Sequence, residues 1–585
     1  LAPAIPFDQV DESISAGKQF IVAEKTSFIL RHLERLKDTY GGDSAARKLE
    51  LLQLLEHRRL ARPREVFRLH EILCFLRAFP DDKGVLTQVE RMLASFVDRA
   101  DLRRHRRALA DTGIAGTAIH YPFYWFTASW LARRWPDRLT IEWADFEKKS
   151  TLVEMLHLLL LYSETPALDE LVFSPREWMH RLKGPHETDA AFLIRRFRAL
   201  HSDSFGRETF YEDLDIPLRL RSGPDTPTRT RAKYPAVPVA FQARPLMRSR
   251  PSLRREVKRP PIAVRELPPR EGQKLIDLAR EAMVTRSRDL DVFEHGNKND
   301  VRLVDCGQGL QFACIGAVPE RRLLLEAVYG FLTLKNGVPI GYVLASALFR
   351  SSEVAYNVFE TYRGAESAFV YVHALAMVRH LFGSDAFTVE TFQLGHNNPE
   401  ALQTGAWWFY YKLGFRPHDP EVRRLLQREL KRMKANPRHR SDVATLDRLA
   451  AENMYLYLRR PRPDVLGRLS LGDVGLQVAR YLAHRFGSNR EKASKTCSRE
   501  AARLLGVRSL RRFSSGERLA WERWSPLIMA LPGVERWSTA DKQVLVRVVR
   551  AKGGRRESDF LPLFDRHRRL RRSIVKLAGA EDESE

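Results

Sequence analysis

The first third of the chain carries apolar residues at helical spacing. Between about residues 21 and 200 they recur three or four positions apart, as at Ile29, Leu33, Leu36 and Tyr40. This period predicts helices that each turn one apolar stripe towards a shared core. The Gly-Gly-Asp-Ser sequence at 41–44 predicts the end of one helix and the cap of the next. We therefore predict an all-α domain over residues 1–220.

One part of this domain is unusually aromatic. Residues 117–143 lie between two helical stretches and contain eight large aromatic side chains: Tyr121, Phe123, Tyr124, Trp125, Phe126, Trp130, Trp135 and Trp143. Such a cluster can form a ligand pocket or a membrane-facing patch. The alternative, a core where helices meet, is favoured because aromatic side chains are mostly buried.

Residues 221–265 break the helical pattern. They hold twelve Lys or Arg against Asp225 and Glu256, together with eight prolines. Proline removes backbone donors and like charges repel, so this stretch is a poor candidate for a packed element. We predict a basic linker over residues 221–261, either a solvated spacer or an arm draped over a domain.

The centre of the chain predicts strands instead. Residues 323–334 and 340–344 are apolar runs joined through Asn336 and Gly337, a pair that favours the positive φ angles of a tight hairpin turn. Residues 354–359 predict a third strand. A loop and a helix follow, and the helix ends at Gly383 with four residues on its apolar face: Tyr371, Leu375, Val378 and Phe382.

Later elements complete the pattern. A strand is predicted over residues 387–392, a helix leads to Gly414 and Phe415, and a last strand occupies 453–458. A basic helical insertion at 421–450 lies between Phe415 and this last strand. In residues 459–585 the apolar residues again recur at helical spacing. The fold class is therefore a multidomain protein of α and α+β type, with a central mixed sheet and a C-terminal helical region.

Two motifs in residues 262–458 resemble the GNAT superfamily of N-acyltransferases. The first is the family's pyrophosphate loop, Gln/Arg-x-x-Gly-x-Gly/Ala, which corresponds here to Arg363, Gly364, Ala365, Glu366, Ser367 and Ala368. The first and last positions match, whereas Glu366 stands where the family prefers glycine. In such a loop, backbone N–H groups at the start of a helix face the cofactor pyrophosphate.

The second motif is Tyr410-x-Lys412-x-Gly414-Phe415, which matches a late Tyr-x-Lys-x-Gly-Phe signature of the family. Gln403 stands seven residues before Tyr410, where the family often has asparagine. The order of strands and helices is also similar to that of the GNAT fold. The resemblance covers about a third of the chain.

The resemblance implies transfer of an acyl group from acyl-CoA or acetyl-CoA, or from an acyl carrier protein, to an amine. Tyr410 matches the family's general acid, which protonates the departing thiolate. Glu360 is the candidate base that removes the ammonium proton, and Glu390 is the alternative. The acceptor stays open among a protein, a peptide, an aminoacyl-tRNA and a lipid amine. A non-catalytic GNAT-derived scaffold that binds nucleic acid or an acidic protein is the second hypothesis.

The charge and the cysteine content of the chain indicate which partners it binds and in which compartment it lies. The formal charge is +25, from 98 Lys plus Arg against 73 Asp plus Glu, which favours an anionic partner such as RNA, an acidic protein or a membrane surface. The insertion at 421–450 is the leading candidate for recognising the acceptor, and on the scaffold hypothesis it is the binding surface. Four scattered cysteines, the lack of zinc-ligand spacing and the lack of a signal peptide or membrane-spanning run predict a cytoplasmic protein without metal.

Overall fold

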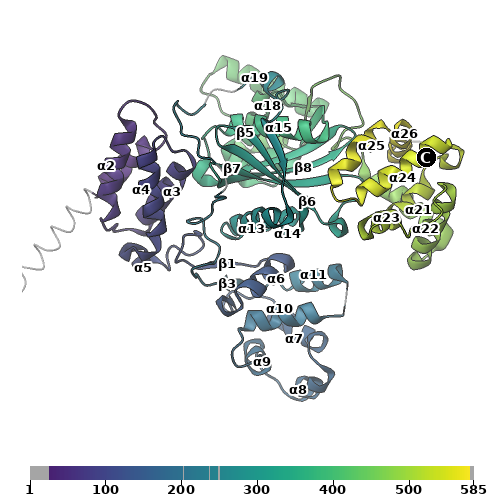
Figure 1. Ribbon diagram of the computed structural model, residues 1–585, viewed down its shortest axis with the longest axis horizontal. Helices are drawn as coiled ribbons and strands as arrows, with labels where there is room; N and C mark the ends of the chain where they lie inside the picture. Colours follow the sequence, from purple (N-terminus) through teal and green to yellow (C-terminus); the bar gives the residue numbers. More distant parts are fainter. Residues whose placement is uncertain (1–25, 202, 236–237, 248–250, 580–585) are drawn as a thin grey trace, which may run out of the picture. The chain divides into compact units, whose positions relative to one another are not determined.

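A computed structural model describes residues 26–201, 203–235, 238–247 and 251–579. The chain forms two compact units (Figure 1). Unit 1 comprises residues 1–246, 275–294 and 335–339, and unit 2 comprises residues 247–274, 295–334 and 340–585. Two short segments of the central region therefore cluster with the N-terminal unit, which sequence patterns did not predict.

Unit 1 is mainly helical, as predicted. Residues 26–36 are helical. The following α-helices are α2 (Ser44–Glu56), α3 (Pro63–Ala78), α4 (Lys83–Ala94), α5 (Ala100–His105), α6 (Trp125–Arg134), α7 (Lys149–Leu159), α8 (Thr165–Glu170), α9 (Pro175–Leu182), α10 (Asp189–Ala199) and α11 (Ser204–Asp213). Side chains of Asp82, Ser174 and Thr188 accept hydrogen bonds at the starts of α4, α9 and α10, which satisfies otherwise unpaired N–H groups.

The prediction that this domain is purely helical is wrong in one respect. Strands β1 (Ile119–Tyr121), β2 (Leu139–Ile141) and β3 (Leu218–Leu220) form a small antiparallel sheet in the order β1-β3-β2. Each strand has three residues, too few for an alternating pattern to stand out from the helical period around it.

The aromatic stretch is a core. Trp125, Trp130 and Trp135 are buried with residues of α7, α9, α10 and β3 in one apolar cluster. The rings of Trp130 and Trp135 meet edge to face at 5.2 Å, and the ring of Trp125 meets that of Tyr211 at 5.4 Å. Of the two alternatives, helix packing therefore accounts for this segment, although Tyr124 remains 49% exposed.

The basic stretch after residue 220 is docked on unit 1 over much of its described length. Thr226, Thr228, Thr230 and Tyr234 are buried. The guanidinium of the buried Arg77 donates to the carbonyls of Thr230 and Arg229 at 2.6 and 3.0 Å. Of the two predicted alternatives, the arm draped over a domain describes residues 226–234, because Glu71 and Glu90 form ion pairs with its Arg229 and Lys233.

A nine-stranded sheet forms the centre of unit 2. Its strands are β4 (Ala263–Glu266), β5 (Gly296–Gly307), β6 (Leu310–Ala317), β7 (Ala327–Lys335), β8 (Val338–Leu348), β9 (Ser351–Val358), β10 (Ala386–Val389), β11 (Arg416–Pro417) and β12 (Met454–Tyr457). The spatial order is β11-β12-β10-β9-β8-β7-β6-β5-β4. Strands β9 and β10 pair in parallel, whereas β4–β5, β5–β6, β8–β9, β10–β12 and β11–β12 pair antiparallel.

Several predicted features of the sheet are present. Asn336 and Gly337 have φ angles of 51° and 79° and link β7 to β8. The strand expected over 387–392 is shorter, because residues from Thr391 onwards turn into α16 (Thr391–Leu394). Helix α12 (Leu253–Glu256) lies inside the predicted basic linker of residues 221–261, and strand β4 begins just after it, at Ala263.

Helices α15 (Ser367–Phe382), α18 (Ala406–Leu413) and α19 (Pro420–Ala435) lie on one side of the sheet (Figure 1). Their apolar residues share one core with β7, β8, β9 and β10. Short helices α17 (Pro399–Thr404) and α20 (Val443–Leu449) accompany them, while α13 (Pro269–Val284) and α14 (Asp291–Glu294) precede β5. The basic insertion is thus two helices, and α19 ends before Pro437, a residue that disfavours helix in its predecessor.

The C-terminal region is helical, as predicted, and belongs to the same compact unit as the sheet. Its helices are α21 (Leu471–Phe486), α22 (Arg490–Leu504), α23 (Ser515–Ala530), α24 (Thr539–Lys552), α25 (Phe560–Arg566) and α26 (Arg568–Ala578). The buried Arg322 donates to the carbonyls of Lys552 and Gly554 at 2.7 and 2.6 Å, and Lys552 pairs with the buried Glu557 at 2.6 Å.

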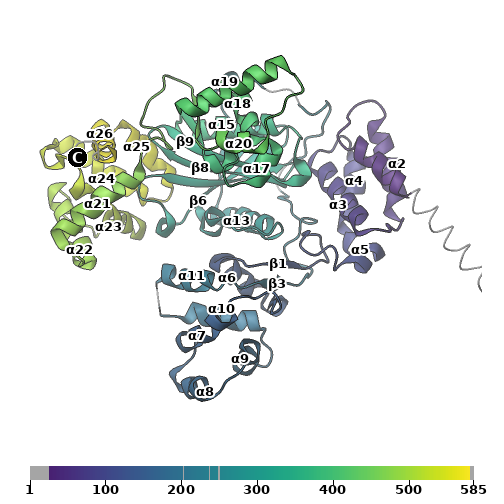
Figure 2. The same cartoon turned by 180° about the vertical axis from the view of Figure 1, so that it is seen from behind.

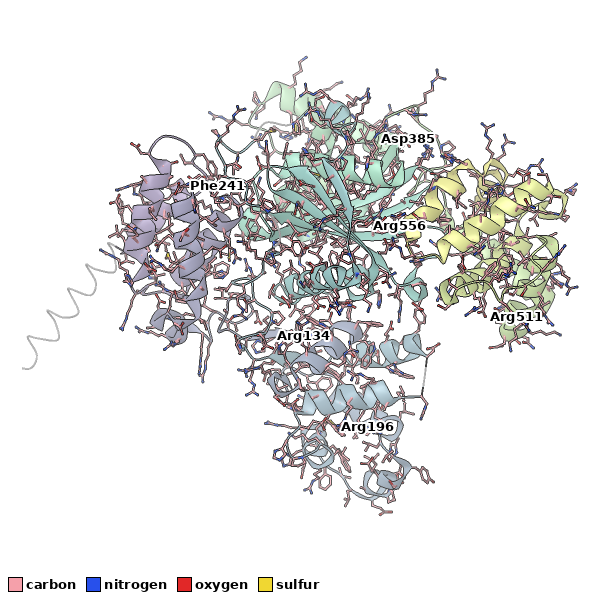
Figure 3. All side chains as sticks on the ribbon, in the orientation of Figure 1. Arg134, Arg196, Phe241, Asp385, Arg511 and Arg556 are labelled. Atoms are coloured by element: carbon pink, nitrogen blue, oxygen red, sulfur yellow. The ribbon has the colours of Figure 1, made fainter. Side chains whose placement is uncertain are left out.

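Two further ion pairs connect the sheet to the chain that follows it. They involve Asp385 and Arg556, which are labelled in Figure 3. Asp385 accepts from Arg462 at 3.1 Å, and Arg556 pairs with Glu266 of β4. Among the residues that the structure describes, no helix combines the length and apolar character needed to cross a membrane.

Candidate functional site

The candidate site begins where two parallel strands part. Strand β9 pairs with β8 along its whole length, from Ser351 to Val358. Its pairing with β10 extends only from Ser351 to Glu353. Residues 354–358 of β9 therefore have no strand partner on the β10 side within the described chain. Unpaired backbone N–H and C=O groups at such an edge can pair with an extended ligand.

The first turn of α15 follows this edge. Glu366 precedes the helix with φ 51° and ψ 20°, in the left-handed region, and its side chain forms no cap. The backbone N–H groups of Ser367, Ala368 and Phe369 have no hydrogen-bond partner among the described residues. Unpaired donors and the positive end of the helix dipole together favour a bound anion, such as a pyrophosphate.

The side chains of the loop differ from what the motif suggested. Glu366 is only 5% exposed and accepts a hydrogen bond from the backbone N–H of Met247 at 3.3 Å. Arg363 forms an ion pair with Glu400 of α17. Gly364 has φ 82° and is exposed, and Ala365 is buried. A pyrophosphate here would meet backbone amides first and would compete with Glu400 for Arg363.

Three tyrosines converge beside this turn, on the face of the sheet that α15 covers. The ring of Tyr371 lies 5.2 Å from that of Tyr356 on β9 and 5.5 Å from that of Tyr410 on α18. Burial raises the pKa of all three phenols, and the neighbouring phenols raise those of Tyr356 and Tyr371 further. The three hydroxyls are therefore protonated at neutral pH and can each donate a proton or a hydrogen bond.

The hydroxyl of Tyr371 is buried without a hydrogen-bond partner in the described structure. Leaving such a group unpaired costs about 1–3 kcal/mol, and buried polar groups usually have partners. The hydroxyl of Tyr356 donates to the carbonyl of Ser367 at 3.3 Å. An acceptor atom placed near Tyr371 and Tyr410 would therefore satisfy a donor that the protein leaves free.

A group of carboxylates lies on the opposite face of the sheet. Successive side chains of a strand alternate between faces, so Glu353 points away from the face that carries Tyr356. Burial in the first place, and the charges of Glu390 and Glu326 in addition, raise the pKa of Glu353 to about 7. A carboxylate with a pKa near 7 is well matched to the work of a general base at neutral pH.

Glu353 was not predicted from the sequence, and no local signal identified it. Its pKa depends on Glu390, which follows β10, and on Glu326, which precedes β7. The proposed alternative base, Glu390, is partly buried and accepts a hydrogen bond from the Thr391 hydroxyl at 3.3 Å. The sequence therefore predicted one member of this group of carboxylates, Glu390, but not Glu353, the residue whose pKa is raised to about 7.

Glu360 and Gln403 lie outside this arrangement. Glu360 begins the 3-10 turn η5 (Glu360–Tyr362) beyond the end of β9, where it is exposed. Gln403 is exposed on α17. Ser367 and Ala368, in contrast, contribute backbone amides to the first turn of α15 as the motif predicts.

A hollow of about 520 Å³ adjoins the carboxylates. Its lining includes Thr391, which follows Glu390, and Tyr455, which pairs with Thr388 in the sheet. Glu452 also lines it and accepts hydrogen bonds from the backbone N–H groups of His418 and Asp419 at 3.0 and 2.7 Å. This polar hollow is large enough for an amine-bearing side chain.

No family model, no curated protein and no solved structure matches the chain. The candidate site therefore rests on the residues and the strand pairing of this chain.

Proposed function

We propose that unit 2 is an N-acyltransferase that takes its acyl group from a CoA thioester and transfers it to an amine. One observation carries the proposal: the unpaired edge of β9 lies next to the first turn of α15, whose amides have no partner in the described chain. The edge can pair with the amide groups of an extended pantetheine arm, and the amides of α15 can bind a pyrophosphate. The order of the last strands, with β12 between β10 and β11, supports the GNAT resemblance.

The proposed chemistry places the acid and the base on opposite faces of the sheet. Glu353 accepts a proton from the acceptor ammonium, directly or through water. Its burial, together with the charge of Glu390, holds its pKa high enough for this role. The amine nitrogen then forms a bond to the thioester carbonyl carbon, and the carbon–sulfur bond breaks. Tyr410 donates its phenolic proton to the departing thiolate. The nitrogen loses its second proton as it becomes the amide, and this proton passes to the tyrosinate directly or through water.

Alignment of the two substrates supplies much of the rate of such a reaction. Holding the reacting atoms together accounts for about 7–11 kcal/mol of the barrier in well-oriented systems. The polar hollow beside Glu390 supports entry of the amine from the face opposite α15. Glu360, the base first suggested by the motif, is replaced in this proposal by Glu353.

Isothermal titration of the full chain with acetyl-CoA and with longer acyl-CoAs tests the proposal, followed by detection of free thiol in the presence of candidate amines. We expect a binding heat that depends on acyl length. Binding without thiol release for any amine would favour the scaffold hypothesis, to which the buried Glu366 and the engaged Arg363 lend support. The absence of any binding heat would refute the proposal that a CoA thioester is the acyl donor.

A further inference from the structure

Helices α19 and α20 carry a cationic hollow that the proposed chemistry does not use. It has a volume of about 840 Å³. We call it the α19 groove, and its lining residues are Pro420, Glu421, Arg423, Arg424, Gln427, Arg428, Lys431 and Arg448. All eight are exposed. Figure 2 shows the two helices, which contact one another, on the outer surface of unit 2.

The protein holds this cationic face in a fixed position. The opposite face of α19 buries Val422, Leu425 and Leu426 in the core of unit 2. On the same buried side, the carboxylate of Glu429 is 1% exposed and accepts from the Ser441 hydroxyl at 2.6 Å and from His439 Nε2 at 2.9 Å. The helix and the segment after it are therefore anchored to each other and to the sheet.

The cations of the groove are largely uncompensated. Arg423, Arg428, Lys431 and Arg448 form no ion pair within the described chain, and Arg424 reaches Glu421 only at 3.6 Å. At a rise of 1.5 Å per residue, the cations from Arg423 to Lys431 extend over about 12 Å. A double helix carries one phosphate charge per roughly 1.7 Å of its axis, so several phosphates can face this patch.

We propose that the α19 groove binds the backbone of double-stranded RNA. The lining lacks aromatic side chains, on which unpaired bases would stack, and lacks large apolar side chains, which a membrane would take up. Gln427 and Glu421 stand among the cations and can hydrogen-bond to ribose 2′-hydroxyls, which the wide minor groove of RNA presents beside its phosphates. Glu421 repels phosphate but accepts from a hydroxyl, which favours RNA over DNA.

Fluorescence anisotropy of a labelled RNA duplex of about 16 base pairs with the full chain tests the proposal. We expect micromolar affinity at about 100 mM salt, in the range of backbone-directed binding. Joint replacement Arg423→Gln, Arg424→Gln, Arg428→Gln and Lys431→Gln should weaken binding at least about tenfold and reduce the slope of log affinity against log salt by about 3. The pair Arg428→Gln and Lys431→Gln should give an intermediate loss.

A matched variant controls for net charge. Lys492, Lys495, Arg499 and Arg503 lie at exposed positions along α22, and their replacement by Gln removes the same charge. We expect this variant to bind RNA within about threefold of the native protein. Equal losses in both variants would overturn the proposal, as would equal affinity for a DNA duplex of the same sequence. Preference for polyglutamate or anionic vesicles, or displacement of the RNA by CoA, would assign the groove to another ligand.

Discussion

Replacement of Glu353 by Gln gives a test that needs no knowledge of the acceptor. The folded protein holds the pKa of this carboxyl at about 7, against an ordinary value of 4.5. The folded state therefore binds this proton more tightly than the unfolded chain does. As pH rises from about 4.5 to 7, ionisation of Glu353 destabilises the fold, and the difference in pKa corresponds to roughly 3 kcal/mol. Gln resembles the protonated form and removes this dependence.

The native and Glu353→Gln proteins should thus have similar stability at pH 4.5, whereas the variant should be more stable above pH 7 by up to roughly 3 kcal/mol. The measurement is denaturant unfolding at several pH values, compared as the difference between the two proteins so that other titrating groups cancel. Glu360→Gln, at an exposed position, is the control and should show no such trend. A difference that stays constant from pH 5 to 9 would show that Glu353 titrates normally and would remove it as the base.

Three further predictions follow from the site and its support. Tyr410→Phe should lower the rate of thiol release about ten- to a thousand-fold, because it removes the hydroxyl that donates the proton. The ring and its packing contacts remain, so the melting temperature should change little. Unchanged turnover would exclude Tyr410 as the acid. Glu366→Gly should tighten CoA binding by at most about tenfold in calorimetry, because glycine fits the left-handed backbone and removes a carboxylate near the amides, whereas binding that appears only in the variant would identify a lost cofactor site. Lys552→Met should destabilise unit 2 by about 3–5 kcal/mol in thermal unfolding, because it strands the buried Glu557, and adding Glu557→Leu should recover much of the loss; equal melting of the single variant and the native protein would contradict this.

Local sequence signals were sufficient to predict some turns and helix ends in the central region of the chain. The turn at Asn336 and Gly337 needs positive φ angles, and α15 ends at Gly383 with φ 73°. Both depend on the backbone preferences of one or two residues, which act wherever the segment lies in the fold.

Features that depend on distant contacts were missed or misassigned. Strand β5, which carries Asp300 and Arg302, was not predicted, and Tyr329 donates to the Asp300 carboxylate at 2.7 Å inside the unit. For the basic stretch after residue 220 the sequence left a spacer and a draped arm open, and the choice depends on residues far away in the sequence, such as Arg77 and Glu71. Glu353 acquired its significance in the same way, because Glu390 and Glu326 approach it only in the folded chain.

The central claim, that the first turn of α15 binds the pyrophosphate of a CoA donor, is tested most directly by calorimetry of CoA binding to the native chain and to Ala368→Glu. A glutamate in the first turn of a helix is favourable for folding, yet it places a negative charge beside the free amides. Thr539→Glu, at an exposed position in the first turn of α24, is the matched control. The account predicts that CoA binds the native and Thr539→Glu proteins equally and that Ala368→Glu weakens binding at least about tenfold. Equal affinity in all three proteins, or no CoA binding by the native chain, would contradict it.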